Sequence, residues 1–91
     1  MAKEQKVDPT YEQVWILFTA YGKGSEQARM DVYTIQLRRF VPIDVLRDAV
    51  DTILQKQKFL PSLAEIYDVC NDVKERKERL ALYRQFESEG W

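Results

Sequence analysis

A proline followed by a helix-capping pattern divides the second half of the chain into two helices. Residues 58–65 read KFLPSLAE. Proline lacks the backbone N–H that a helix interior requires, so Pro61 prevents one helix from running through this stretch. Ser62 and Glu65 match the S-x-x-E capping box, in which each side chain bonds the backbone amide of the other residue. The sequence therefore predicts a rigid corner, with Phe59 filling the gap between the two helices that meet there.

The clearest amphipathic helix of the chain precedes this corner. From Ile43 onward, apolar residues recur at the three- and four-residue spacing of one helix face: Leu46, Ala49, Val50, Ile53 and Leu54. The opposite side is charged: Arg47, Asp48, Asp51 and Lys56. We predict a helix that begins just after Pro42, ends near the QKQK at 55–58, and turns its apolar side to a core.

A first helix is predicted from Pro9 to about Tyr21. Asp8-Pro9-Thr10 is typical of a helix start, because proline suits the first turn and Asp8 or Thr10 can cap it, with Gln13 completing a capping box after Thr10. One broad apolar stripe follows: Tyr11, Val14, Trp15, Phe18 and Tyr21. We expect Trp15 and Phe18 in the core, because large rings dominate burial in a small domain.

A second helix is predicted from Ser25, as its cap, to about Arg39. Gly22 and Gly24 end the helix before it. Its expected apolar side is Ala28, Val32 and Ile35, with Tyr33, Leu37 and Phe40 as further candidates. This stripe is less regular than that of the first helix.

The fourth helix begins at the corner and is expected to contribute five core residues: Leu63, Ile66, Val69, Cys70 and Val73. Beyond Val73 the apolar residues thin to Leu80, Tyr83 and Phe86 among many charges. Either this end folds back onto the first helix, or it offers an apolar strip to another chain. The predicted organisation is a flexible N-terminus at 1–8, a helical domain at 9–80, and a helix end or tail at 81–91.

These elements predict an all-α fold, a compact bundle of about four helices with a long C-terminal helix. A chain of 91 residues has room for one domain with one modest core. Its polar start and the lack of any apolar run near the length of a bilayer crossing lead us to expect a cytoplasmic protein with no membrane contact.

The residue content argues against catalysis. The chain has no histidine, the commonest general base near neutral pH and the commonest zinc ligand, and its single cysteine is Cys70. Gly22 and Gly24 join two helical patterns and do not follow a strand, as a phosphate-binding loop would. We expect no catalytic residues, cofactor or metal, and therefore not an enzyme.

The charge balance argues against direct nucleic-acid binding as the main activity. The formal net charge is −1, although this value does not exclude local basic patches. The most basic stretch, KERKER at 74–79, interleaves acids and bases, and we interpret it as a solvated helix face. The alternative is a small DNA-binding regulator that uses the second helix or this 74–79 stretch.

If the function is protein binding, aromatic and arginine side chains near the C-terminus are the candidates, because these residue types dominate interface energetics. The predicted partner-binding residues are Arg76, Arg79, Tyr83, Arg84, Phe86 and Trp91. The chain is expected to be a monomer or a weak dimer through its C-terminal helix.

The run VPIDVLRDAVDTILQKQKFLPSLAEIYDV at 41–69 resembles the small phage proteins that load or inhibit the hexameric replicative helicase. The resemblance is carried by an amphipathic helix with a central alanine and by the corner after it: Ala49, Lys58, Phe59, Pro61, Ala64, Glu65 and Ile66. It implies an all-helical adaptor in phage-type DNA replication, in the cytoplasm of a bacterial host, with a replicative helicase or its loader as partner. In that family a C-terminal extension grips the helicase, and here Tyr83, Phe86 and Trp91 would take its place.

Overall fold

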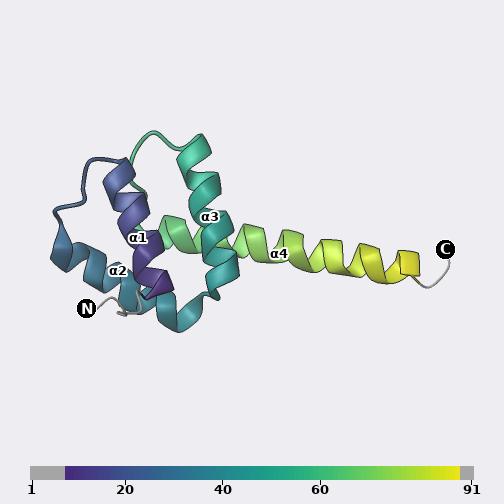
Figure 1. Ribbon diagram of the computed structural model, residues 1–91. Helices are drawn as coiled ribbons and strands as arrows, with labels where there is room; N and C mark the ends of the chain where they lie inside the picture. Colours follow the sequence, from purple (N-terminus) through teal and green to yellow (C-terminus); the bar gives the residue numbers. More distant parts are fainter. Residues whose placement is uncertain (1–7, 89–91) are drawn as a thin grey trace, which may run out of the picture.

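The computed structural model describes residues 8–88, and the side chains through residue 85. Four helices make up this part: α1 (Pro9–Ala20), α2 (Gln27–Phe40), α3 (Ile43–Lys56) and α4 (Leu63–Ser88). Residues 8–88 contain no β-strand, and none of their helices has the length and apolar character to cross a bilayer. The predicted all-α bundle with a long C-terminal helix is confirmed (Figure 1).

The core lies where the first three helices meet the first half of α4. α1 packs against both α2 and α3, and α3 packs against α4. All four helices contribute fully buried apolar side chains: Val14, Leu17, Phe18, Met30, Leu37, Leu46, Val50, Ile53 and Ile66. Burying each such side chain is worth about 1.5–3 kcal/mol, so this cluster supplies the main driving force for folding. The predicted burial of Leu46, Ala49, Val50 and Ile53 on α3 and of Ile66, Cys70 and Val73 on α4 is confirmed. Leu54, predicted on the same face of α3, is 37 % exposed, and Leu63 and Val69 are only partly buried.

Both ends of α1 use local hydrogen bonds that the sequence indicates. The Thr10 amide donates to Asp8 Oδ1 at 3.0 Å, so Asp8, and not Thr10, is the cap. At the other end, the Lys23 amide donates to the Phe18 carbonyl at 2.8 Å and the Gly22 amide to that of Thr19 at 3.0 Å. This is a Schellman motif, which requires a left-handed residue, and Gly22 has φ +75°.

The predicted capping box at the α3–α4 corner is confirmed. The Ser62 amide donates to Glu65 Oε1 at 2.8 Å, and the Glu65 amide donates to Ser62 Oγ at 3.2 Å. These two bonds satisfy amides that would otherwise lack partners at the start of α4. α4 therefore begins at a defined residue.

The predicted role of Phe59 in this corner is wrong. Its side chain is 80 % exposed, whereas Pro61 is among the fully buried side chains. The hydroxyl of Tyr33 donates to the Pro61 carbonyl at 3.3 Å, so α2 reaches the corner from inside and the space between the helices is already filled. Phe59 is left on the outer side of the turn.

Trp15 is also misplaced by the sequence prediction, whereas Phe18 is in the core as expected. Trp15 is 47 % exposed and Phe18 is fully buried. The buried arc of α1 includes Thr10 and Leu17, which moves its centre away from Trp15 by part of a turn. Trp15 therefore lies at the edge of the stripe.

α2 starts later than predicted, and of the predicted apolar residues it buries only Tyr33 and Leu37. Its cap is Glu26, without a side-chain bond, and not Ser25. The buried residues are Met30, Tyr33, Thr34 and Leu37. Four of the predicted residues are exposed: Ala28, Val32, Ile35 and Phe40. Thr34 can be buried because its hydroxyl donates to the Met30 carbonyl at 2.8 Å, which removes the cost of hiding a polar group.

The second half of α4 extends away from the other helices (Figure 1). The radius of gyration is 15.8 Å and the longest dimension is 52 Å. A compact domain of this length has a radius of gyration of about 12 Å. The difference reflects one helix that belongs to the bundle only through its first half.

Candidate partner-binding surface

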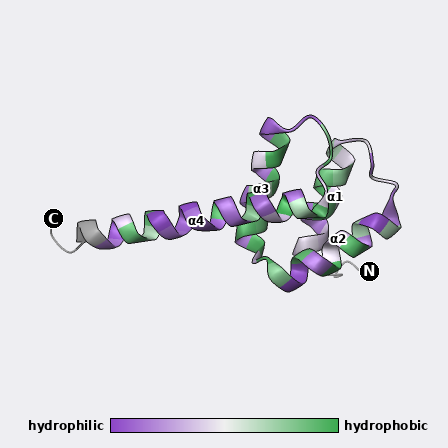
Figure 2. Ribbon diagram, turned by 180° about the vertical axis from the view of Figure 1, so that it is seen from behind, coloured by the Kyte–Doolittle hydropathy of each residue, from purple (hydrophilic) through white to green (hydrophobic). Residues whose placement is uncertain are grey.

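α4 changes from a core helix to an exposed helix after Val73. Val73 is 4 % exposed, whereas Leu80 and Tyr83 are 55 % and 65 % exposed. Every residue from 78 to 85 is exposed, and we name residues 78–88 the projecting segment. Figure 2 shows the part of this segment through residue 85 as mainly hydrophilic with separate hydrophobic bands.

The exposure of the projecting segment decides whether the end of α4 folds back onto α1 or stays exposed, a choice that the sequence left open. Leu80 and Tyr83 do not fold back onto α1, because they are more than half exposed. The backbone of α4 runs without a break through residue 80 to Ser88. Phe86 lies in this helix, but its side chain is beyond those described, and Trp91 lies outside the described residues altogether.

A pair of carboxylates on α3 holds α4 at the point where it leaves the bundle. Lys77 Nζ lies 2.9 Å from Asp48 Oδ2 and 3.7 Å from Asp44 Oδ2. The hydrogen bond to Asp48 raises the pKa of Lys77; burial opposes this, and the negative charges of Asp48 and Asp44 add to it. The ammonium group therefore stays charged near neutral pH and ties the two helices together.

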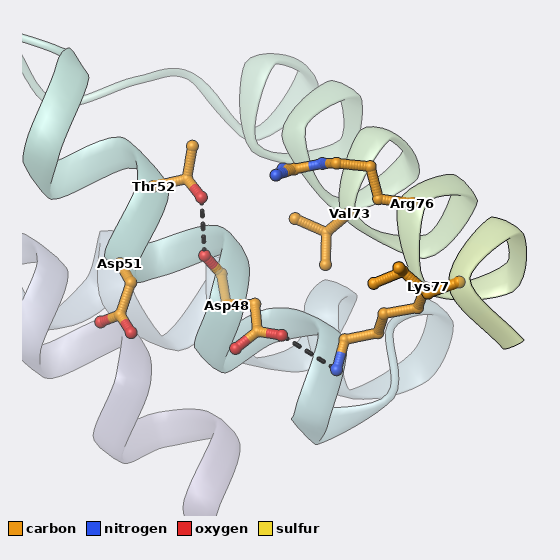
Figure 3. A pocket seen from close by; sticks show the side chains of 7 residues that line it. Asp48, Asp51, Thr52, Val73, Arg76 and Lys77 are labelled. Atoms are coloured by element: carbon orange, nitrogen blue, oxygen red, sulfur yellow. Dashed lines mark hydrogen bonds and ion pairs between the residues drawn. The ribbon is translucent and has the colours of Figure 1, made fainter. Parts of the chain in front are cut away.

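A groove of about 330 Å³ runs between α3 and α4 beside this ion pair. Its α3 wall carries Asp48, Asp51 and Thr52, and its α4 wall carries Val73, Arg76, Lys77 and Leu80. Figure 3 shows Arg76 reaching from α4 toward Thr52, on the other side of Val73 from the Lys77–Asp48 contact. The groove thus has a carboxylate wall facing a basic one and opens next to the projecting segment.

The predicted residues on α4 fall on two neighbouring surfaces. Arg76, Arg79, Leu80 and Tyr83 line a mostly apolar hollow of about 260 Å³. Arg84 instead lines a second hollow with Lys77, Leu80 and Ala81. Leu80 is shared by both, so it lies at the centre of the surface, with arginines on either side.

The arginines of this surface are not used by the fold. Asp72 with Arg76, and Glu75 with Arg79, have the sequence spacing of helical ion pairs, but within the side chains of residues 8–85 neither pair is in contact. The 74–79 stretch is exposed apart from the partly buried Lys77. Its guanidinium groups are therefore available to another molecule.

The single cysteine is a core residue. Burial raises the pKa of the Cys70 thiol to about 11. A thiol of this kind is protonated near neutral pH and reacts slowly, because the thiolate is the nucleophile. In the part of the chain that the structure describes, no three His, Cys, Asp or Glu side chains are grouped so that they could hold a metal ion.

Sequence reasoning missed the Lys77 contact with Asp44 and Asp48 and the exposed Leu82, which is 54 % exposed on the projecting segment. The ion pair joins residues about 30 positions apart in the sequence, so no short-range spacing of residue types predicts it. The position of Lys77 one turn after Val73 is the one available signal, because it places a cation at the end of the buried stripe.

Comparisons of the chain with protein-family models, with curated proteins and with solved structures find no match.

Proposed function

We propose that this protein is a non-catalytic adaptor that binds a partner protein through the projecting segment of α4. The observation that carries the proposal is the exposure of Leu80 and Tyr83 on a helix that has left its own core. A tyrosine flanked by arginines matches the composition of interface hot spots, and Leu80 adds apolar area beside it.

The chemistry of the surface indicates what the partner must offer. Leu80 and Tyr83 need an apolar recess, and Arg76, Arg79 and Arg84 need carboxylates at its rim. A helix laid in such a groove is a recurrent mode of protein recognition. The absence of histidine from the sequence supports a binding role over acid–base catalysis.

The resemblance of residues 41–69 to helicase-loading and helicase-inhibiting phage proteins suggests the partner. We propose a hexameric replicative helicase of phage-type DNA replication, or the protein that loads it. An adaptor of this kind acts by binding one conformation or assembly state of its partner more tightly than another. Loading and inhibition are two outcomes of that same mechanism.

Two leucines of the projecting segment provide a matched test. Leu80 and Leu82 are 55 % and 54 % exposed on the same helix, but residues two apart do not share a face. Titration calorimetry with the purified helicase and with its loader should show that Leu80→Ala weakens binding at least about fivefold, the loss of about 1 kcal/mol that only a minority of interface residues exceed. Leu82→Ala should leave it within about twofold, as a surface substitution outside the contact does.

Equal effects of the two leucine variants would contradict the assignment of the face. Binding to neither protein would remove the helicase part of the proposal. If the protein instead binds duplex DNA and charge reversal of Arg76 and Arg79 abolishes that binding, the DNA-regulator alternative replaces the adaptor.

A further inference from the structure

A second surface lies at the other end of α4, around the exposed Phe59. The side chains that line this corner hollow, of about 310 Å³, come from three parts of the chain: Tyr21, Lys23, Arg29, Lys58, Phe59 and Leu60. Figure 1 shows that the α1–α2 turn and the α3–α4 corner lie on the same side of the molecule. The fold thus collects two lysines and an arginine around an aromatic ring.

The corner is built to hold Lys58 and Phe59 in place. The hydroxyl of Tyr21 donates to the Gln57 carbonyl at 2.8 Å, just before these two residues. The hydroxyl of Tyr33 donates to the Pro61 carbonyl just after them, and Pro61 is fully buried. The chain is therefore fixed on both sides, while the ring between the fixed points is 80 % exposed.

The other two cations are also positioned by the fold. Lys23 follows Gly22 in the Schellman motif that ends α1. Arg29 forms an ion pair with Glu26 at 3.1 Å and lies 5.7 Å from the centre of the Phe18 ring and 5.8 Å from that of Tyr33. Among the side chains of residues 8–85, no carboxylate lines the hollow, and Glu26 offsets only one of the three cations. The local charge of the hollow, counted over these residues, is therefore positive.

We infer that the corner hollow binds single-stranded nucleic acid, with a base stacked on Phe59 and backbone phosphates beside Lys58, Lys23 and Arg29. Proteins bind single strands by combining aromatic stacking platforms with a positive track for the phosphates. Because the backbone on both sides of Phe59 is held by Tyr21 and Tyr33, little backbone freedom is lost when a base stacks on the ring. The site is separate from the projecting segment, and the inference does not rest on the proposed adaptor function.

This site shares only Arg29 with the second helix, one of the two nucleic-acid surfaces that the sequence suggested, and nothing with the 74–79 stretch. Neither the net charge nor the 74–79 stretch predicts it, because its cations are separated by up to 35 positions in the sequence. The contact is small, so the expected affinity is modest. Three phosphate contacts to a single strand give a slope of log K against log salt of about −2.

The test is fluorescence anisotropy of a fluorescein-labelled oligothymidylate of about 15 nucleotides, a length that covers the usual site sizes, with an oligouridylate as second probe. The 91-residue protein should bind at about 50 mM salt and more weakly at about 200 mM. Phe59→Ala should weaken binding at least about fivefold, the lower limit for loss of one stacked base. Lys58→Glu should weaken oligonucleotide binding more than Phe59→Ala does, and it should reduce the slope of log K against log salt.

Matched controls come from α4. Tyr83→Ala removes another exposed aromatic ring, and Lys74→Glu reverses another exposed lysine. Neither should change oligonucleotide binding by more than about twofold, as expected for surface positions outside the contact. Because Phe59 and Lys58 are exposed, their variants should keep the wild-type melting temperature, and circular dichroism checks this.

Three results would overturn the inference: absence of oligonucleotide binding at low salt, binding that Phe59→Ala leaves unchanged, or binding lost in Lys74→Glu but kept in Lys58→Glu. A labelled peptide of alternating Asp and Leu is a further probe in the same anisotropy experiment. If it binds at the corner and the oligonucleotides do not, the surface recognises an acidic protein segment instead. Failure of this test leaves the Leu80 experiment unaffected, so the two proposals can fail separately.

Discussion

The exposure of the projecting segment leads to a quantitative prediction about stability. The double variant Leu80→Ala/Tyr83→Ala should lower the free energy of unfolding by no more than about 2 kcal/mol. Complete burial of a side chain of this size is worth about 1.5–3 kcal/mol. Leu80 is 55 % exposed and Tyr83 is 65 % exposed, so less than half of each side chain is shielded and each can contribute at most about 1 kcal/mol.

The reference variant for this prediction is Ile66→Ala in the first half of the same helix. Ile66 is fully buried, and truncation of a buried isoleucine to alanine costs about 2–5 kcal/mol. In a domain of this size that loss lowers the melting temperature by about 4–8 °C for each kcal/mol. Urea denaturation followed by circular dichroism measures both variants on one scale.

The comparison refutes the reasoning if the double variant loses as much stability as Ile66→Ala. That result would mean that Leu80 and Tyr83 are packed against the bundle in solution, and the projecting segment would no longer be available to a partner. Leu82→Ala serves as a further control, because its exposure equals that of Leu80.

Three further predictions follow from individual contacts. Ser62→Ala should lower the free energy of unfolding by about 1 kcal/mol, because it removes the cap on the Glu65 amide; no change in the urea midpoint would show that the capping box does not contribute. The pKa of Lys77 is raised in the folded protein, so the stability that its ion pair adds is present below the unfolded pKa of 10.5 and is lost as the pH rises through the folded value. Above about pH 10.5 the free energy of unfolding of Lys77→Met should therefore fall less steeply with pH than that of wild type, as measured by urea titrations at several pH values. Parallel curves for the two proteins would contradict this. Cys70, with a pKa of about 11, should react with a thiol reagent at pH 8 far more slowly in the folded protein than in guanidinium, and a fast reaction of the folded protein would place the thiol at the surface.

Features encoded by short-range spacing could be predicted from the sequence. The capping box at Ser62 and Glu65, the glycine that ends α1, and the buried face of α3 each depend on residues within about two turns of one another. Their geometry is fixed by the local backbone, so the pattern of residue types is enough to identify them.

Choices between two helix faces could not be made in the same way. On α2 the pattern Ala28, Val32, Ile35 and the pattern Met30, Tyr33, Leu37 both have helical spacing, and only packing against α1 selects the second. The same holds for Trp15, which lies at one edge of a stripe whose other edge is Leu17. Where a helix is apolar over more than half of its circumference, its neighbours decide which residues are buried.

The candidate sites depend even more on contacts between distant parts of the sequence, which a single sequence does not reveal. Arg76, Arg79, Tyr83 and Arg84 could be placed near one another from the sequence because they share one helix. The ion pair of Lys77 with Asp48 and the cations around Phe59 could not be predicted, because each joins segments that the fold brings together from distant parts of the sequence. The exposure of Phe59 follows from the hydroxyls of Tyr21, just after α1, and of Tyr33 on α2, which bind the corner from inside.

The two proposed surfaces lie at opposite ends of one helix, and this arrangement bears on how an adaptor works. Between Ser62 and Tyr83, α4 spans about 30 Å at 1.5 Å per residue. Sites this far apart, with no shared contacts, should behave independently, so the effects of Phe59→Ala and Tyr83→Ala on the two ligands should add within about 0.5 kcal/mol. The capping box fixes where the helix starts and Lys77 fixes the direction in which it leaves α3, so a strand held at the corner and a protein held at the projecting segment would keep a set distance from each other. A measured coupling well above that limit would mean that α4 or the corner changes conformation when either ligand binds, and the helix would then act as a switch between the two sites and not as a spacer.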